Sequence, residues 1–318
     1  MRSLQQRRPR RSLTDVLTHV RAPEAWQVSR GAGVTIAVVD TGICATRAEF
    51  PGWKRSSIDL PTDFHGAHWK DARGHGSMCA AVAAGSRSEG GRFDGIAPGA
   101  HLISARSSLL DSGIPDLCEI YGHLIDLKRR GEINGPLVIS NSYGLRRREP
   151  VTGAPEDDPL VQVVRAAVDE GIPVVFGAGN NHHDELCRHD PTAAGPGTIW
   201  GVNSLEQVIT VGAVDWNDSN QDPTTRHRNS SRGPGQWSGA RPKPDCVAPT
   251  YGTVPWGRRT RETEWWGTSG ACAQVAGLAA LLLSVDASLR PDEIAEVIRD
   301  TARPTGAPKK CVGAGVID

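Results

Sequence analysis

The stretch that decides the fold is Val34-Thr35-Ile36-Ala37-Val38-Val39-Asp40-Thr41-Gly42, an apolar run that ends in a carboxylate. Its apolar residues do not alternate with polar ones, and several are β-branched. This pattern is typical of a strand that is buried on both faces of a parallel sheet. We therefore expect Asp40 at the carboxyl end of a central strand, the edge at which open α/β sheets gather their functional groups.

Further apolar runs and helical patterns alternate along the chain. Strands are expected at 101–105, 137–141, 173–176 and 208–211. Helices are expected at 77–84, 116–130, 159–170, 271–284 and 291–301. The last helix has a proline and two acids in its first turn, which is a helix-start signal. Strands that alternate with helices predict an α/β fold with a mostly parallel central sheet and helices on both faces.

Two more segments carry the groups that a serine nucleophile needs. His75 lies in Gly74-His75-Gly76-Ser77, and Ser269 lies in Gly267-Thr268-Ser269-Gly270-Ala271. Each precedes a run of small residues that predicts a helix, and a helix amino terminus favours developing negative charge. A serine hydroxyl needs a base to take its proton and a carboxylate to orient that base. The residues thus predict a triad of Asp40, His75 and Ser269, in a chain order distinct from those of chymotrypsin and the α/β-hydrolases.

The chain resembles the subtilases, the subtilisin-like serine peptidases, from about Ala22 to its carboxyl terminus. The resemblance is carried by the aspartate motif at 38–43, the histidine motif at 74–80, the serine motif at 267–277, the segment 174–180 that ends in asparagine, and two landmarks at 95–100 and 209–214. It implies a three-layer subtilisin-like fold. It also implies a serine endopeptidase that works through an acyl-enzyme.

The resemblance assigns further roles to individual residues. Asn180 would donate its side-chain N–H to the oxyanion, together with the backbone N–H of Ser269. A protein or peptide substrate would bind as an extended strand. The residues expected to contact it are Ser142, Tyr143, Gly144, Gly177, Ala178 and Gly179.

Three positions in the serine motif depart from the family pattern. Gly270 stands where methionine is usual, Ala273 where proline is usual, and Gln274 where histidine is common. The missing proline is expected to change how the helix entry is held. None of the three removes a reacting atom, so an inactive enzyme is not expected.

Composition bounds the class of protein. The 36 basic and 36 acidic residues cancel, which argues against a general nucleic-acid binder. The motifs span residues 40 to 269, so we expect one peptidase domain at 19–318. Five arginines crowd the first eleven residues. They predict a flexible basic arm at 1–18, which is a candidate inhibitor of the chain's own site.

Several features bear on location. No apolar run is expected to reach membrane-spanning length, and no hydrophobic segment typical of an export signal follows the arginines. The seven cysteines are odd in number and show no paired spacing. Mostly reduced thiols in a cytoplasmic protein are therefore expected, with one or two disulfides as the alternative. No metal or other cofactor is expected, and calcium is left unpredicted.

Three softer signals lie near the motifs. The loop 181–190 holds three histidines, three acids and a cysteine; it is interpreted as a solvated polar loop, an acidic wall that favours a basic substrate residue, or a metal site. Cys79 and Cys272 are either buried packing residues or the basis of a thiol-sensitive site. Trp69, Trp265 and Trp266 are either core-edge residues or the lining of an apolar peptide cleft.

Three functions remain open from the residues alone. The first is a serine endopeptidase for intracellular protein or peptide processing. The second is a peptide ligase or macrocyclase that uses the same acyl-enzyme but excludes water. The third is an inactive scaffold that binds peptide strands.

Overall fold

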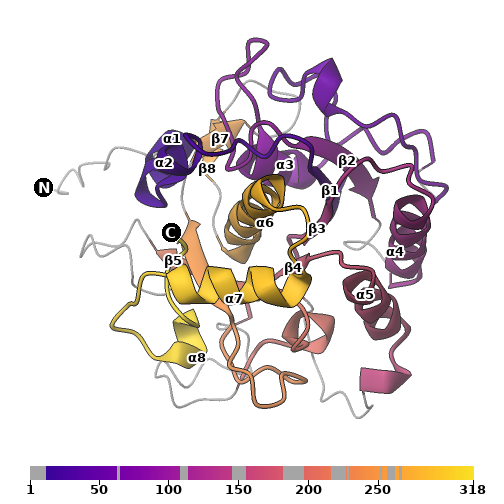
Figure 1. Ribbon diagram of the computed structural model, residues 1–318. Coiled ribbons are helices and arrows are strands. Elements are labelled where there is room, and N and C mark those ends of the chain that lie inside the picture. Colours follow the sequence, from indigo (N-terminus) through magenta and orange to yellow (C-terminus); the bar gives the residue numbers. More distant parts are fainter. Residues whose placement is uncertain are drawn as a thin grey trace, which may run out of the picture.

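A six-stranded, all-parallel sheet forms the centre of the computed structural model, which describes residues 12–62, 65–107, 114–144, 155–181, 197–215, 227, 229–250, 253–255, 262–264 and 267–318 (Figure 1). The strands lie in the order β2-β1-β3-β4-β5-β6. Their bounds are β1 Thr35–Asp40, β2 His101–Arg106, β3 Leu137–Asn141, β4 Val174–Gly177, β5 Ile209–Asp215 and β6 Cys246–Thr250. Two short antiparallel strands, β7 Thr253–Pro255 and β8 Glu262–Glu264, lie outside this sheet.

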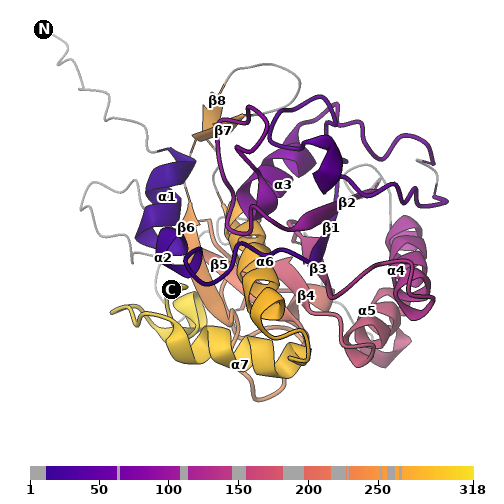
Figure 2. The same ribbon diagram turned by 45° about the horizontal axis from the view of Figure 1, so that its top comes forward.

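Helices cover both faces of the sheet, which confirms the predicted α/β class (Figure 2). One face packs against α1 (Leu13–His19), α3 (His75–Ala84), α6 (Thr268–Val285) and α7 (Pro291–Thr301). The other packs against α4 (Ile114–Arg129) and α5 (Pro159–Asp169). The short helices α2 (Ala22–Ala25) and α8 (Lys309–Val312) complete the α-helices of the described residues.

Strand β1 shows why its sequence is apolar throughout. Ile36 and Val38 point into the core beneath α3 and α6, whereas Ala37 and Val39 point into the core beneath α4 and α5. Successive residues of a strand face opposite sides. Because both sides are covered, every position of β1 is buried.

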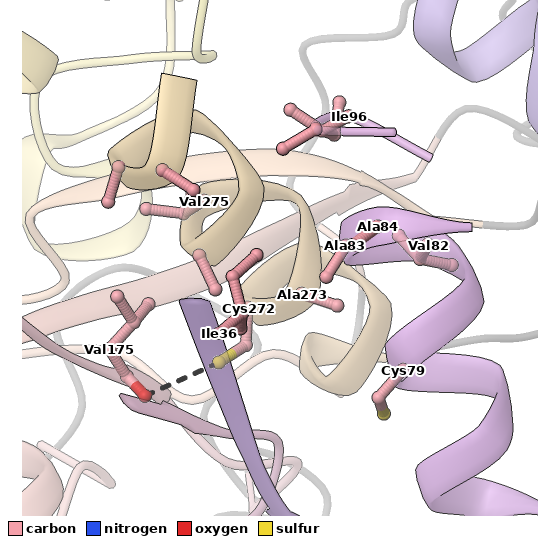
Figure 3. Packing of buried hydrophobic residues seen from close by; sticks show 14 of the residues in the cluster. Ile36, Cys79, Val82, Ala83, Ala84, Ile96, Val175, Cys272, Ala273 and Val275 are labelled. Atoms are coloured by element: carbon pink, nitrogen blue, oxygen red, sulfur yellow. Dashed lines mark hydrogen bonds between the residues drawn. The ribbon is translucent and has the colours of Figure 1, made fainter. Parts of the chain in front are cut away.

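Small side chains let α3 and α6 lie close together over the sheet. Figure 3 shows Ala83 and Ala84 of α3 near Ala273 and Val275 of α6, with Ile36 of β1 beneath them. All five of these side chains are fully buried. Dense packing of this kind fixes the two helices whose amino termini carry His75 and Ser269.

The strand order creates a functional edge. After β1 the chain moves to β2 on one side, and then returns to β3 on the other side of β1. Ligands of open α/β sheets bind at such a reversal, at the carboxyl ends of the strands. Asp40 ends β1 and Asn141 ends β3, so both lie at this edge.

The amino-terminal boundary of the domain was predicted wrongly. All but the last residue of helix α1 falls in the arm expected at 1–18, yet Leu13, Val16 and Leu17 are buried in the core under α3 and α6. Ser12 caps the helix in a capping box with Asp15. Any arm is therefore confined to residues 1–11, which lie outside the described residues.

The prediction that no apolar run approaches membrane-spanning length needs correction as well. Helix α6 has 18 residues and a mean hydropathy of 1.6, which is enough to cross a membrane by length and composition. Within the fold, 72% of that window is buried. Its apolar character is that of a core helix, since it packs against α3 and five strands of the sheet.

Candidate active site

The three predicted triad residues meet at the carboxyl edge of the sheet. His75 Nδ1 lies 2.7 Å from Asp40 Oδ1 and 2.9 Å from Asp40 Oδ2. His75 Nε2 lies 3.0 Å from Ser269 Oγ. With Nδ1–H donating to the carboxylate, Nε2 is left as the acceptor for the serine proton. The side chains come from the end of β1, the first residue of α3 and the first turn of α6.

The Asp40 carboxylate sets the basicity of the imidazole. Burial disfavours the imidazolium, but the negative charge of Asp40, the neighbouring Cys79 and the hydrogen bonds to both together raise the pKa of His75 well above its usual value. Asp40 is itself oriented by the backbone N–H of Thr41, which donates to Oδ1 at 2.7 Å. The carboxylate therefore both holds the ring and stabilises its protonated form.

Ser142 is joined to Ser269 by two hydrogen bonds. Its hydroxyl donates to the carbonyl oxygen of Ser269 at 3.0 Å, and the Ser269 hydroxyl lies 3.0 Å from the carbonyl oxygen of Ser142. The single Ser269 proton thus faces two acceptors, His75 Nε2 and Ser142 O. Ser142 is only 2% exposed, so its side chain positions Ser269 and does not form a surface for substrate.

Asn180, the residue expected to serve as an oxyanion donor, lies beside the start of α6. Its Oδ1 accepts a hydrogen bond from the backbone N–H of Thr268 at 3.0 Å. This bond fixes the orientation of the amide, and Nδ2 is directed away from Thr268. Gly267 makes the approach feasible: its φ is +85°, and a Cβ there would lie 2.6 Å from Asn180 Oδ1.

Two segments expected to bind substrate run side by side beyond β3 and β4. The Asn203 side chain donates to both Tyr143 O and Gly177 O at 2.7 Å, which ties the two segments together. Gly179 N donates to Thr268 Oγ1 at 3.2 Å and so joins this region to the serine helix. The structure therefore gathers the predicted binding segments next to the nucleophile.

Tyr143 turns its ring inward. The ring packs edge-on against Phe176 with 5.7 Å between centroids, and its hydroxyl donates to Asn141 Oδ1 at 3.0 Å. The side chain of Tyr143 is therefore held against the core. The other residues expected to contact substrate, Gly144 and Ala178, lie on the same two segments.

The unusual residues of the serine motif lie in the buried part of α6. Gln274 is fully buried and donates to Pro249 O at 2.8 Å and to Gly270 O at 3.1 Å. Ala273 packs in the core. In place of the missing proline, the Thr268 to Asn180 bond and the buried Gln274 amide hold the entry of α6.

The two cysteines nearest the triad are buried packing residues. Cys79 Sγ lies 3.8 Å from His75 Nδ1, and Cys272 Sγ donates to Asn141 O at 3.4 Å. Figure 3 shows the second contact of Cys272, to Val175 O at 3.6 Å. Burial raises the pKa of the Cys79 thiol and raises that of Cys272 to about 12. Both thiols are thus protonated at neutral pH. Six cysteines of the described part of the chain are free; Cys187 lies outside it.

One cluster of potential metal ligands occurs within the described residues. Ligand atoms of Asp40, His75 and Cys79 lie within 4.8 Å of one another. Two of the three are already hydrogen-bonded to each other as part of the triad. The arrangement therefore suits proton transfer rather than a resident metal.

Some expectations fall on parts that the structure does not describe. The loop 182–190, with its polar, acidic-wall and metal interpretations, is one; Trp265 and Trp266 are another. Trp69 is described and packs, partly buried, against the main core, which favours the core-edge interpretation for this tryptophan.

Sequence reasoning missed two polar residues that build the site. Asn203 gave no signal, because an isolated asparagine in a loop is common. Asp71 lies four residues before His75, and its carboxylate accepts hydrogen bonds from Gly74 N and Ser77 N at the start of α3. An acid just before a helix is a known capping signal, so this residue could have been found.

Comparisons with known proteins point in one direction. The profile of the subtilase family matches residues 31–315. Serine protease AprX of Bacillus subtilis is 32% identical over 92% of this chain and 66% of its own length. The calcium-dependent protease of Nostoc sp. is 29% identical over 92% of this chain, which spans 45% of that protein. The crystal structure of MycP1 with its N-terminal propeptide removed superposes with a TM-score of 0.65, at 28% identity, and covers 95% of this chain and 94% of that one.

Proposed function

The chain belongs to the subtilase family, and from this premise we propose that it is a serine endopeptidase whose nucleophile is Ser269. The observation that carries the proposal is the continuous hydrogen-bonded path from Asp40 through His75 to Ser269, with steps of 2.7 and 3.0 Å. Both distances lie within the range for proton transfer between a nucleophile, its base and an orienting carboxylate.

The geometry supports a two-step acyl transfer. Ser269 Oγ forms a bond to the peptide carbonyl carbon while its proton passes to His75 Nε2. The carbonyl oxygen becomes an oxyanion that accepts hydrogen bonds from Asn180 Nδ2 and the Ser269 backbone N–H. When the C–N bond breaks, the same proton moves from His75 to the leaving amine. Water then repeats the sequence on the acyl-enzyme and releases the acid and free Ser269.

The edge position of the two segments around Tyr143 and Gly177 supports binding of an extended peptide. Tyr143 follows β3, and Gly177 ends β4. A substrate laid in extended conformation against the Tyr143 segment would pair with its backbone as an added strand. Their spacing is held by the Asn203 amide. The proposed substrate is accordingly a protein or peptide in extended conformation.

A fluorophosphonate probe tests the nucleophile directly. The full-length chain should become labelled at Ser269, as located by peptide mass mapping, and Ser269→Ala should remain unlabelled. Absence of labelling in the folded wild-type chain would contradict the peptidase and favour the inactive scaffold. Among labelled chains, product masses separate the two reactions: hydrolysed peptide supports the peptidase, and a cyclised or ligated peptide would support the ligase.

We also propose that the basic arm inhibits the site until it is removed, now limited to residues 1–11. The five arginines in this segment motivate the proposal. Intact mass measured during activation tests it. A chain that is fully active while uncut would rule out an inhibitory arm.

The proposed setting is intracellular processing in the cytoplasm. The free state of the six described cysteines supports a reducing compartment. Fractionation of cells that express the tagged chain, with antibody detection, would test this. Recovery of the chain outside the cytoplasm would contradict it.

A further inference from the structure

A buried carboxylate next to the triad has no role in the acyl-transfer chemistry. Asp71 is 2% exposed and accepts five hydrogen bonds. Oδ1 accepts from Thr41 Oγ1 at 3.0 Å, Arg73 N at 3.1 Å and Gly74 N at 2.7 Å. Oδ2 accepts from Ser77 N at 2.9 Å and Ser77 Oγ at 2.7 Å. A buried carboxylate satisfied in this way is rigid, because moving it would break several charge-assisted bonds at once.

These five donors come from two segments that carry different triad members. Gly74 and Ser77 flank His75 at the start of α3, whereas Thr41 directly follows Asp40 at the end of β1. Asp71 therefore bonds to both sides of the Asp40–His75 hydrogen bond.

Thr41 completes the link between the end of β1 and the start of α3. Its hydroxyl donates to Asp71 and accepts from Gly76 N at 2.9 Å, while its own backbone N–H donates to Asp40 Oδ1 at 2.7 Å. Thr41 thus contacts the carboxylate of the triad with one group and the histidine helix with another. Asp71 orients the hydroxyl, since the hydroxyl proton can point at only one acceptor.

The two segments touch so closely that little freedom remains. A Cβ on Gly76 would lie 2.2 Å from Gly42 O and 3.1 Å from Asp40 Cβ. Only glycine permits this approach. The close contact between these two segments therefore limits how far Asp40 and His75 can move relative to each other.

We propose that Asp71 is a positioning residue for the triad: through Thr41, Gly74 and Ser77 it holds the end of β1 and the start of α3 in the one alignment that lets Asp40 orient His75. The inference rests on the proposed function. It predicts that loss of Asp71 slows the chemical step and leaves substrate binding nearly unchanged. Misplacement of a base by a fraction of an ångström is enough to slow proton transfer.

The test compares matched variants with the fluorophosphonate probe. For Asp71→Ala, the maximal rate of labelling should fall roughly 10- to 100-fold, while the half-saturating probe concentration changes less than about twofold. Asp71→Asn keeps one acceptor and should lie between. Thr41→Val should fall like Asp71→Ala, whereas Thr41→Ser keeps the hydroxyl and should restore most of the rate.

A spectroscopic readout separates positioning from general destabilisation. The His75 Hδ1 proton, identified by its absence in His75→Ala, should shift or broaden in the proton NMR spectra of Asp71→Ala and Thr41→Val. The control is Asp94→Asn. Asp94 is a buried carboxylate bonded to Arg87 N and Arg30 at 3.0 Å, away from the triad. It should lower thermal stability without changing labelling or the Hδ1 signal.

Two outcomes would overturn the inference. Wild-type labelling and an unshifted Hδ1 signal in Asp71→Ala would overturn the inference, and so would an equal loss of labelling in Asp94→Asn. If Asp71→Ala does not fold, the Thr41→Val and Thr41→Ser pair carries the same test. If the wild type is not labelled at all, the proposed function fails, and the Hδ1 signal still tests the positioning role.

Discussion

Asp71 and Asp245 are both buried carboxylates, but they lie at opposite edges of the sheet and among different partners. Asp71 lies at the carboxyl edge and accepts only from backbone N–H and hydroxyl groups. Asp245 lies at the amino edge, just before β6, and pairs with Lys243 at 2.6 Å and Arg299 at 3.2 Å. It also accepts from Thr210 N at the start of β5.

The difference separates two uses of a buried charge. At the amino edge, Asp245 neutralises cations and ties β5, β6 and α7 together; burial lowers the pKa of Lys243, and Asp245 opposes that shift. At the carboxyl edge, the hydrogen-bond donors to Asp71 are neutral. They fix the orientation of its carboxylate and do not balance its charge. We therefore expect catalysis to depend on the carboxyl edge and stability on the amino edge, with little exchange between them.

The largest expected effect is the loss of activity when His75, at the carboxyl edge, is replaced. A comparable loss from a substitution at the amino edge would contradict the comparison. His75→Ala should lower kcat/KM for a peptide anilide by at least roughly 10⁴-fold, because His75 is the basic side chain that contacts Ser269 Oγ within the part of the chain that the structure describes. Its melting temperature should stay close to that of the wild type, measured by circular dichroism. Residual activity within tenfold of the wild type would mean that another group acts as the base.

At the amino edge the expected effect is on stability. Asp245→Ala should lower the free energy of unfolding by about 3–5 kcal/mol, because Lys243 is left buried without its carboxylate. Urea denaturation measures the loss. Activity per fluorophosphonate-labelled site should be unchanged, and a tenfold fall would contradict the separation. Arg299→Ala, a milder variant of the same cluster, should show the same pattern with a smaller loss.

A pH series sharpens the comparison at a single residue. Activity requires neutral His75, and its pKa is raised, so kcat/KM should fall as pH drops through a value above 6.5. The same raised pKa means that the folded state binds the proton more tightly than the unfolded state, so the contribution of His75 to stability grows as pH falls. Activity and this contribution should change in opposite directions. An acid limb below pH 6.5 would contradict the assignment.

The smallest effect concerns the thiols beside the triad. Burial raises the pKa of Cys79 and Cys272, so iodoacetamide at neutral pH should leave both unmodified and activity unchanged. Cys118, which is partly exposed, should react first among the described cysteines. Peptide mapping with a parallel activity assay checks this. Rapid inactivation that Cys79→Ala abolishes would revive the thiol-sensitive interpretation.

The elements that could be predicted are those with a strong local signal. Strand β1 and helices α5 and α7 have long uninterrupted patterns, and their predicted bounds differ from the observed ones by at most one residue. Strand β6 was missed because Cys246, Val247 and Ala248 form a short apolar run between two prolines. Helix α1 was missed because it is short and follows a basic segment, which drew the whole region into one interpretation.

The residues of the site likewise divide into those with a strong local sequence signal and those without one. Asp40, His75 and Ser269 stand in glycine-rich motifs at element ends, and the structure brings them within hydrogen-bonding distance. Asn203 bonds to two carbonyl oxygens from segments distant in sequence, which only the folded chain reveals. The role of Asp71 depends likewise on the meeting of β1 and α3. Local patterns reveal reacting groups, whereas the residues that align them become visible through tertiary contacts.

Helix α6 has a consequence of its own. It carries the nucleophile in its first turn and extends about 27 Å, at 1.5 Å per residue, through the centre of the molecule in contact with α3 and five strands of the sheet. The reactive serine is thus one tip of the same rod around which the whole interior is assembled. On heating, peptidase activity and the folded structure should then be lost in a single transition, with no earlier, reversible loss of activity.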